Sequence, residues 1–184
     1  MKNDELVIIG IYPHESQDLV SVVVLSNDGN IQVRSVIQYE GLEAINFLDD
    51  LKNRPLWSYV DAFVIFENLK SKEIISKLES ENKTIIPMCL TPLENNGYES
   101  KEACKFRLLL DYIGDKKKNH QIQFQDISNE FVREFENFGS GFNYDLDSIL
   151  NNKDKSGYSI WAFLLACQGM MSLEFNKTTK AVIK

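Results

Sequence analysis

Glu67 is the residue whose position in the sequence most suggests chemistry. It follows residues 60–66, a run of seven in which six are apolar and Val and Ile are interleaved with Phe. Such a run predicts a strand that is covered on both faces, inside a sheet flanked by helices. Ligands and catalytic groups gather at the carboxyl ends of strands in open α/β sheets. Glu67 is therefore the first candidate for a catalytic or metal-binding carboxylate; the alternative role is a negative charge at the start of a helix.

Other acidic side chains lie in two polar segments from which they could reach Glu67. One segment follows the first predicted strand, and the other precedes the last predicted helix. These acids are candidates to act together with Glu67. The alternative is that they are ordinary solvated loop residues. The acids are Glu15 and Asp18 in the first segment, next to His14, and Asp145, Asp147 and Asp154 in the second.

Periodicity and turn signals predict the elements that must position these residues. Residues 6–11, 19–25 and 31–38 predict an antiparallel meander, because Asp28-Gly29 supplies the positive φ of a tight hairpin turn. Two further strands are expected at residues 60–66 and 84–89. Residues 121–124 fit a short strand at an edge of the sheet. Apolar residues at helical spacing predict helices over residues 41–52, 71–82, 101–113, 127–138 and 158–173.

Several of these elements carry specific expectations. Leu108 and Leu109 should lie on the buried side of their helix, and the charged residues 115–119 should form a solvated turn after it. The last helix is almost wholly apolar and is expected to be buried. Residues 139–157 predict a long polar loop of a length that is usually functional or mobile. The tail from residue 176 to 184 is expected to be flexible.

Composition limits the protein to a single domain of ordinary size over residues 1–184. The net charge of −7 disfavours a dedicated duplex-binding module but does not exclude a nuclease, whose metal carboxylates are acidic. Three widely spaced cysteines, Cys89, Cys104 and Cys167, predict reduced and mostly buried thiols. The sequence shows neither a secretory signal nor an apolar run of membrane-spanning length. We therefore expect a cytoplasmic location, in the host cell if the protein is viral.

The order of the predicted elements resembles the RNase H-like fold, and the motifs resemble the nuclease domain of phage large terminases, the motors that package viral DNA. The resemblance covers about residues 6–172. The family has Gly-Ile-Asp-Pro at the end of its first strand, where this chain has Gly10-Ile11-Tyr12-Pro13. Asp18-Leu19-Val20-Ser21 resembles the family's step into its second strand, and Glu67-Asn68 resembles its carboxylate and Asn after the fourth strand. Residues 134–138 resemble a helix that ends in Glu-x-x-x-Phe.

The resemblance implies a two-metal nuclease in which three acidic residues hold the metal ions that clamp the attacking and leaving oxygens of a phosphodiester. Two of these three positions are not acidic in this chain. Tyr12 stands at the first, and Gly157-Tyr158 stands where the family opens its last helix with Asp-Asp. A phenol with a pKa of about 10 is a poor ligand for a hard cation. Only Glu67 remains, so the acidic motif is expected to be degenerate.

The sequence therefore predicts an α/β, RNase H-like mixed sheet of about five strands, an antiparallel meander followed by parallel strands, flanked by helices. The predicted function is a terminase-nuclease-like domain of a viral DNA-packaging system that has lost cleavage, needs no metal cofactor, and docks protein or DNA. One alternative is an active Mg²⁺- or Mn²⁺-dependent endonuclease in which Asp18 and Asp145 or Asp147 complete the site around Glu67. Another is an α/β protein-interaction domain without nucleic acid. The expected partners are DNA or packaging-complex proteins, and no membrane is expected.

Overall fold

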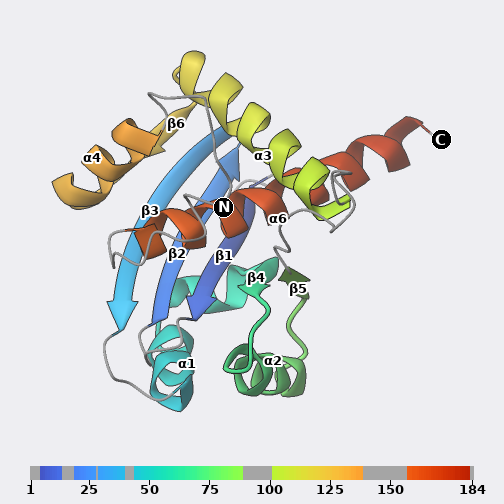
Figure 1. The fold of residues 1–184 in the computed structure, drawn as a ribbon. Helices are drawn as coiled ribbons and strands as arrows, with labels where there is room; N and C mark the ends of the chain where they lie inside the picture. The colour runs from blue at the N-terminus through green and yellow to red at the C-terminus, as the bar shows by residue number, and fades with distance from the viewer. Residues whose placement is uncertain are drawn as a thin grey trace, which may run out of the picture.

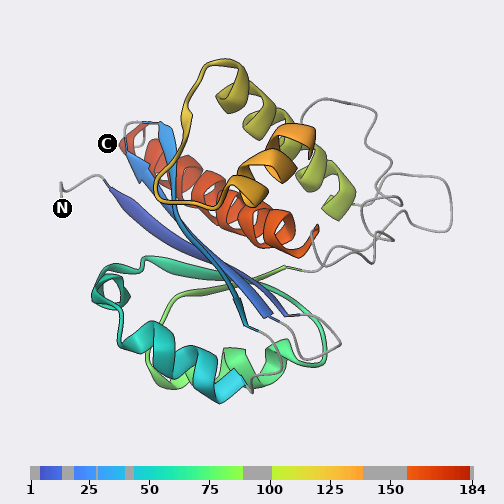
Figure 2. The same ribbon diagram turned by 90° about the vertical axis from the view of Figure 1, so that its left-hand side faces the viewer.

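A six-stranded mixed sheet lies between two layers of helices in the computed structural model (Figures 1 and 2). The structure describes residues 5–13, 19–27, 29–39, 44–88, 101–138 and 157–182. Its elements, in chain order, are β1 (Leu6–Pro13), β2 (Leu19–Asn27), β3 (Asn30–Tyr39), α1 (Ala44–Lys52), the 3-10 helix η1 (Pro55–Tyr59), β4 (Ala62–Phe66), α2 (Ser71–Ser80), β5 (Ile85–Met88), α3 (Lys101–Lys118), β6 (Ile122–Phe124), α4 (Asn129–Phe138) and α6 (Gly157–Val182).

The strand order in the sheet is β5-β4-β1-β2-β3-β6. β1, β2 and β3 form the predicted antiparallel meander, and Gly29 turns the chain between β2 and β3 with a φ of 77°. β4 lies parallel to β1, as the apolar run at 60–66 predicted, and β5 lies parallel to β4 on its other side. The prediction of about five strands falls one short because residues 122–124 do pair, parallel to β3, at the edge of the sheet. The mixed sheet flanked by helices is confirmed.

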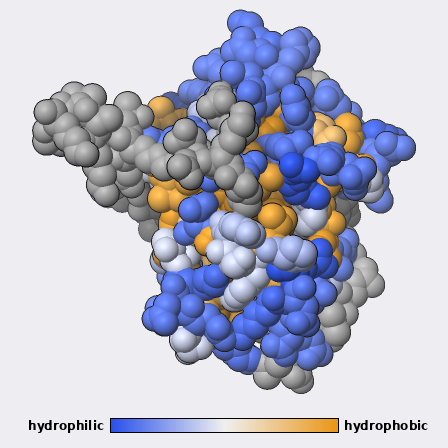
Figure 3. Space-filling model, turned by 180° about the vertical axis from the view of Figure 1, so that it is seen from behind, coloured by the Kyte–Doolittle hydropathy of each residue, from blue (hydrophilic) through white to orange (hydrophobic). Residues whose placement is uncertain are grey.

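Each face of the sheet has its own hydrophobic core, because successive strand residues point to opposite faces. Ile8, Val22 and Val64 belong to the core beneath α3, α4 and α6. Ile9 and Phe63 belong to the core beneath α1 and α2. Figure 2 shows these two helical layers on opposite sides of the sheet. Figure 3 shows the back of the molecule relative to Figure 1. Hydrophobic side chains gather in the middle of this surface, between hydrophilic regions above and below.

α6 is the helix that comes closest to the sheet. It is buried throughout residues 160–170, and it packs on β1, β2 and β4. A Cβ atom on Gly10 of β1 would lie 1.9 Å from the carbonyl oxygen of Ala162 and 2.7 Å from the backbone nitrogen of Ala166. A Cβ atom on Gly169 would lie 2.4 Å from Cγ2 of Val64. The two glycines therefore allow the helix backbone to approach the sheet more closely than any side chain would permit.

The prediction of a solvated turn at residues 115–119 is wrong, because α3 continues to Lys118. Three lysines form its last turn, where positive charge interacts favourably with the helix dipole. Lys116 donates a hydrogen bond to the carbonyl oxygen of Gly29, and Lys117 forms an ion pair of 3.4 Å with Glu136. These lysines thus join α3 to the β2–β3 turn and to α4, instead of facing only solvent.

Leu108 is also placed differently from the sequence prediction. Its side chain is 61% exposed, whereas Leu109, Leu110 and Ile113 fill the core on the opposite side of α3. Leu109 is therefore on the buried side of α3, as predicted, and Leu108 is not.

α6 begins at Gly157 and continues to Val182, past the predicted end at residue 173. Gly157, predicted as the last residue of the long loop, is thus the first residue of the helix. Figure 1 shows the C-terminal turns of α6 projecting beyond the sheet. The remainder of the predicted loop, residues 139–156, lies outside the described residues. Within the described part of the chain, no helix is long and apolar enough to cross a membrane.

Candidate functional site

The carboxyl ends of the neighbouring central strands β1 and β4 lie side by side. The predicted site residues that the structure describes lie at this end of the strands. The parallel register pairs Ile11 with Ile65, so the next residues, Tyr12 and Phe66, are neighbours. Both side chains point to the α6 face, where they pack against the core. Their ring centroids are 5.2 Å apart, with an angle of 39° between the ring planes.

The first turns of α6 add two more aromatic rings to this pair. The ring of Tyr158 stacks on that of Tyr12 at 5.6 Å and 27°, and Trp161 stacks on Tyr12 at 6.1 Å and 21°. Tyr158 and Trp161 are each only 5% exposed, whereas Tyr12 and Phe66 are partly buried. We call Tyr12, Phe66, Tyr158 and Trp161 the aromatic cluster. Offset-stacked and tilted rings at these distances stabilise the packing beyond simple area burial.

Glu67 follows the aromatic cluster directly along the chain, and its side chain is exposed. Its backbone N–H donates to the carbonyl oxygen of Met88 at 2.8 Å, which extends the β4–β5 pairing by one residue. Glu67, Tyr12 and Tyr158 therefore lie at the same end of the sheet, as the sequence predicted. The structure adds that Tyr12 and Tyr158 contact each other.

Asn68 holds the chain in place after Glu67. Its side-chain oxygen accepts hydrogen bonds from the N–H groups of Lys70 and Ser71, both at 3.0 Å, and so caps the start of α2. The hydroxyl of Ser71 accepts from the N–H of Asn68 at 3.0 Å, which makes the capping reciprocal. The Asn68 amide nitrogen also donates to the carbonyl oxygen of Pro13 at 2.6 Å. One side chain thus ties the end of β1 to the β4–α2 junction and fixes the backbone beside Glu67.

The described side chains at this end of the sheet do not fit a two-metal centre. Glu67 supplies one carboxylate, Tyr12 and Tyr158 supply phenols, and Gly157 has no side chain. A single carboxylate does not hold two divalent cations against their mutual repulsion. More widely, no group of three His, Cys, Asp or Glu side chains in the described ranges could hold a metal ion.

Asp18, Asp145 and Asp147, together with His14, Glu15 and Asp154, lie outside the described residues. Phe66 and Trp161 were missed as site residues by the sequence reasoning. Trp161 lies three residues after Tyr158 on a helix, and this spacing places both on one face and could have revealed the pair.

Two carboxylates of the described chain have a shifted pKa. Burial, and then the neighbouring carboxylate of Glu130, raise the pKa of Glu134 in α4 to about 7. On the opposite face of the sheet, hydrogen bonds from Tyr39 and then Arg54 lower the pKa of Asp50. The Arg54 and Tyr39 bonds to Asp50 join α1 to β3 and η1, which is a structural role.

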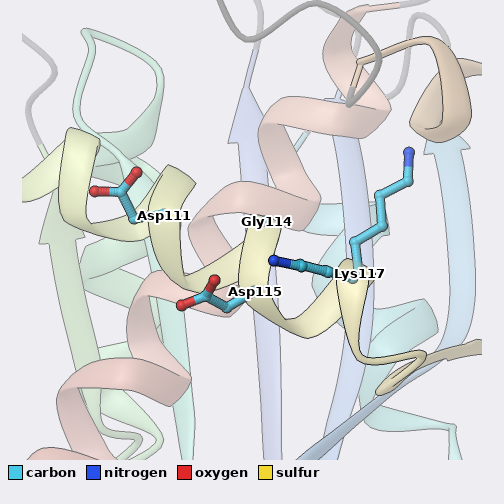
Figure 4. A pocket seen from close by; sticks show the side chains of 5 residues that line it. Asp111, Gly114, Asp115 and Lys117 are labelled. Atoms are coloured by element: carbon cyan, nitrogen blue, oxygen red, sulfur yellow. The ribbon is translucent and has the colours of Figure 1, made fainter.

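A cavity of about 630 Å³ lies against α3 (Figure 4). Its described lining residues are Asp111, Gly114, Asp115, Lys117 and Lys118, all from α3. None of the predicted site residues that the structure describes is among them. The cavity is therefore not part of the site at the ends of β1 and β4.

No family model matches the sequence, and no curated protein matches it. Solved structures of other proteins superpose on the fold of this chain. The large terminase of one thermophilic bacteriophage superposes with a TM-score of 0.60 at 11% identity, over 93% of this chain and 41% of the terminase. The large terminase nuclease of thermophilic phage G20c, solved with bound zinc and with bound magnesium, superposes with a TM-score of 0.55 at 13% identity, over 90% of this chain and 81% or 82% of the nuclease.

The strand order and these superpositions show an RNase H-like fold. Within that class, the chain has the fold of phage large terminase nuclease domains. It spans about two fifths of the length of the first of these large terminases.

Proposed function

We propose that this chain is a terminase-nuclease-like domain of a viral DNA-packaging system that has lost metal-dependent cleavage and acts as a docking module. The observation that carries the proposal is the stack of Tyr12 on Tyr158, with ring centroids 5.6 Å apart. The family resemblance places metal-binding acids at these two positions. Here two phenol rings and the indole of Trp161 pack against one another beside the strand ends, and Tyr158 and Trp161 are each 5% exposed.

Physical chemistry supports loss of the two-metal reaction. That reaction needs several carboxylates to hold cations about 3.5–4 Å apart. A buried phenol offers no negative charge at neutral pH, since its ordinary pKa is about 10. Tyr158 is 5% exposed, so the position could not take a hydrated cation without opening the core.

Cleavage and metal binding test the proposal directly. Purified protein is incubated with supercoiled plasmid in millimolar Mg²⁺ or Mn²⁺, with an active metal-dependent nuclease as the positive control, and metal binding is followed by calorimetry. We expect neither cleavage nor binding at millimolar metal. The Glu67→Ala variant distinguishes the protein's own activity from a contaminating nuclease. Cleavage that is abolished by Glu67→Ala, in a variant of unchanged thermal stability, would overturn the proposal.

The competing function is an active nuclease, and the exposure of Glu67 at the carboxyl end of β4 favours it. In this reading Asp18 and either Asp145 or Asp147 supply the missing ligands for Mg²⁺ or Mn²⁺. The same cleavage assay, repeated on Asp18→Asn, Asp145→Asn and Asp147→Asn, identifies those ligands if activity is found.

A further inference from the structure

The C-terminal half of α6 is held to the molecule differently from its N-terminal half. Residues 160–170 are buried, and the helix backbone there lies directly on Gly10 of β1. Residues 171–174 are only half-buried. The turns that follow residue 174 project beyond the sheet (Figure 1). The apolar packing that holds α6 therefore weakens toward its C-terminal end.

Glu174 fastens this weaker half to two other elements. Its Oε1 atom accepts a hydrogen bond from the hydroxyl of Ser26 at 2.6 Å, and its Oε2 atom accepts one from the hydroxyl of Tyr112 at 3.2 Å. Ser26 is the penultimate residue of β2 and is 4% exposed, and Tyr112 lies in α3. We call Ser26, Tyr112 and Glu174 the polar clasp. Hydrogen bonds to a charged group are stronger than those between neutral groups.

Tyr112 is kept in place as a donor of the polar clasp. Burial, followed by the charge of Glu174, raises the pKa of the Tyr112 phenol, so the phenol keeps its proton at neutral pH. The Nζ atom of Lys116 lies 5.3 Å from the centroid of the Tyr112 ring, and Lys116 also donates to the carbonyl oxygen of Gly29. The clasp thus lies near the β2–β3 turn, at the opposite end of α6 from the aromatic cluster.

Residues 168 and 169 form a weak point between the two halves of α6. Gly169 lies in the interior of the helix, where glycine is less stable than alanine. Gln168 is 7% exposed, and its side-chain oxygen has no hydrogen-bond partner among the described residues. Its amide nitrogen makes only a long bond of 3.4 Å to the hydroxyl of Ser172. Opening the helix here lets water reach the buried oxygen, which reduces the cost of opening.

We propose that residues 170–182 of α6 detach from the sheet as a unit, hinged at residues 168–169, when the polar clasp breaks, while residues 157–167 stay packed. The clasp is then the device that keeps the C-terminal half of the helix closed. The aromatic cluster remains intact when the clasp opens, because it lies in the first turns of the same helix. The clasp acts in this way whether or not the candidate site cleaves DNA.

Hydrogen exchange of the native protein, read by mass spectrometry of peptic fragments, measures local opening along the chain. We expect Glu174→Ala to speed exchange of the amides of residues 170–182 about tenfold or more, with exchange at residues 158–166 unchanged. Ser26→Ala and Tyr112→Phe should give smaller increases in the same segment. Combined with Glu174→Ala, neither should add a further increase, because the acceptor is already absent.

The matched control is Leu78→Ala, at a fully buried position of α2 on the opposite face of the sheet. It should lower the urea midpoint but speed exchange of residues 170–182 less than Glu174→Ala does. Equal acceleration at residues 158–166 and 170–182 in Glu174→Ala would overturn the proposal, because α6 would then open only with the whole fold. Unchanged exchange in that variant, or additive effects of Ser26→Ala and Glu174→Ala, would also overturn it. Should Glu174→Ala fail to fold, Ser26→Ala and Tyr112→Phe decide by the same comparison of the two segments.

Discussion

Tyr12 shows how one side chain changes what the end of a strand can do. At the carboxyl end of β1 an aspartate would place a negative charge on the α6 face of the sheet. The phenol instead packs on Phe66, Tyr158 and Trp161 and becomes part of the hydrophobic core on that face. The same position that would bind a cation in an acidic motif here stabilises the contact between α6 and the sheet.

Replacing Tyr158 by Asp should therefore destabilise the protein and not restore a metal site. The side chain is 5% exposed, and an unpaired carboxylate at such a position loses its hydration. We expect Tyr158→Asp to lower the free energy of unfolding by about 3–5 kcal/mol, measured by urea denaturation. Tyr158→Phe keeps the stacked ring and should cost no more than about 1.5 kcal/mol. Equal stability of the two variants would show that the ring is not packed as described.

Asn68 is the second residue whose single side chain has structural consequences. Asn68→Ala removes the cap of α2 and the bond to Pro13, and we expect it to cost about 1–2 kcal/mol of unfolding free energy. Asn68→Asp keeps the acceptor oxygen for the cap but loses the donor to Pro13, so its cost should be smaller. The measurement is chemical denaturation of both variants. If the alanine variant were as stable as the parent, the hydrogen bonds of Asn68 would not stabilise the β4–α2 junction.

At the scale of elements, the placement of α6 depends on the absence of side chains at its contact with β1. The helix backbone at Ala162 and Ala166 lies directly over Gly10. Because backbone atoms cannot move aside as a flexible side chain can, this contact fixes the distance between helix and sheet. The aromatic cluster includes Tyr158 and Trp161 in the first turns of the same helix, so its geometry depends on that distance.

Gly10→Ala should displace α6 from the sheet. The added Cβ would lie 1.9 Å from a backbone oxygen, and we expect a loss of about 3 kcal/mol or more in the free energy of unfolding. The matched control is Gly157→Ala at the first residue of α6, where nothing lies within 4 Å of the added atom. Alanine favours helix, so this control should be neutral or stabilising by up to about 1 kcal/mol. Trp161 fluorescence should change in the first variant and not in the second.

At the scale of the whole molecule, the chain carries a net charge of −7, and several of its described lysines make contacts within the protein. The lysines in the last turn of α3 join it to the β2–β3 turn and to α4. On the α1–α2 side, Lys83 lies 4.4 Å from the centroid of the Trp57 ring. Lys83, Lys116 and Lys117 therefore make contacts within the molecule.

The half-buried Glu134 predicts how global stability depends on pH. Its pKa is raised to about 7 in the folded protein, chiefly by burial, from 4.5 in the unfolded chain. Its folded form therefore favours the proton, and stability present below pH 4.5 is lost as pH rises through about 7. Glu134→Gln should remove this loss and be more stable than the parent at pH 8, but not at pH 4.5, in urea titrations. Glu79→Gln, at an exposed position of α2, controls for removal of a charge.

The sequence by itself determined the meander, the buried central strand and the buried last helix, because each depends on local patterns. Alternating apolar residues, the Gly29 turn and the apolar run before Glu67 contain enough information for these elements. Tyr12 and Glu67 could be assigned to one end of the sheet, since neighbouring parallel strands have their carboxyl ends at the same end. Tyr158 could be added because the last helix was expected to begin against those strand ends. The exact ends of α3 and α6 could not be predicted, because tertiary contacts of Lys116 and Lys117 extend the first.

Only the tertiary structure decided what lies at that end. The stacking of Tyr12 on Tyr158 and Trp161 joins residues that are far apart in the chain, and no local pattern reports such a contact. The close approach of α6 to Gly10, which brings those rings together, likewise depends on the packing of a helix against a strand formed much earlier in the chain. The hydrogen bond from Asn68 to Pro13 joins the β4–α2 junction to the end of β1, and long-range contacts of this kind exist only once the chain has folded.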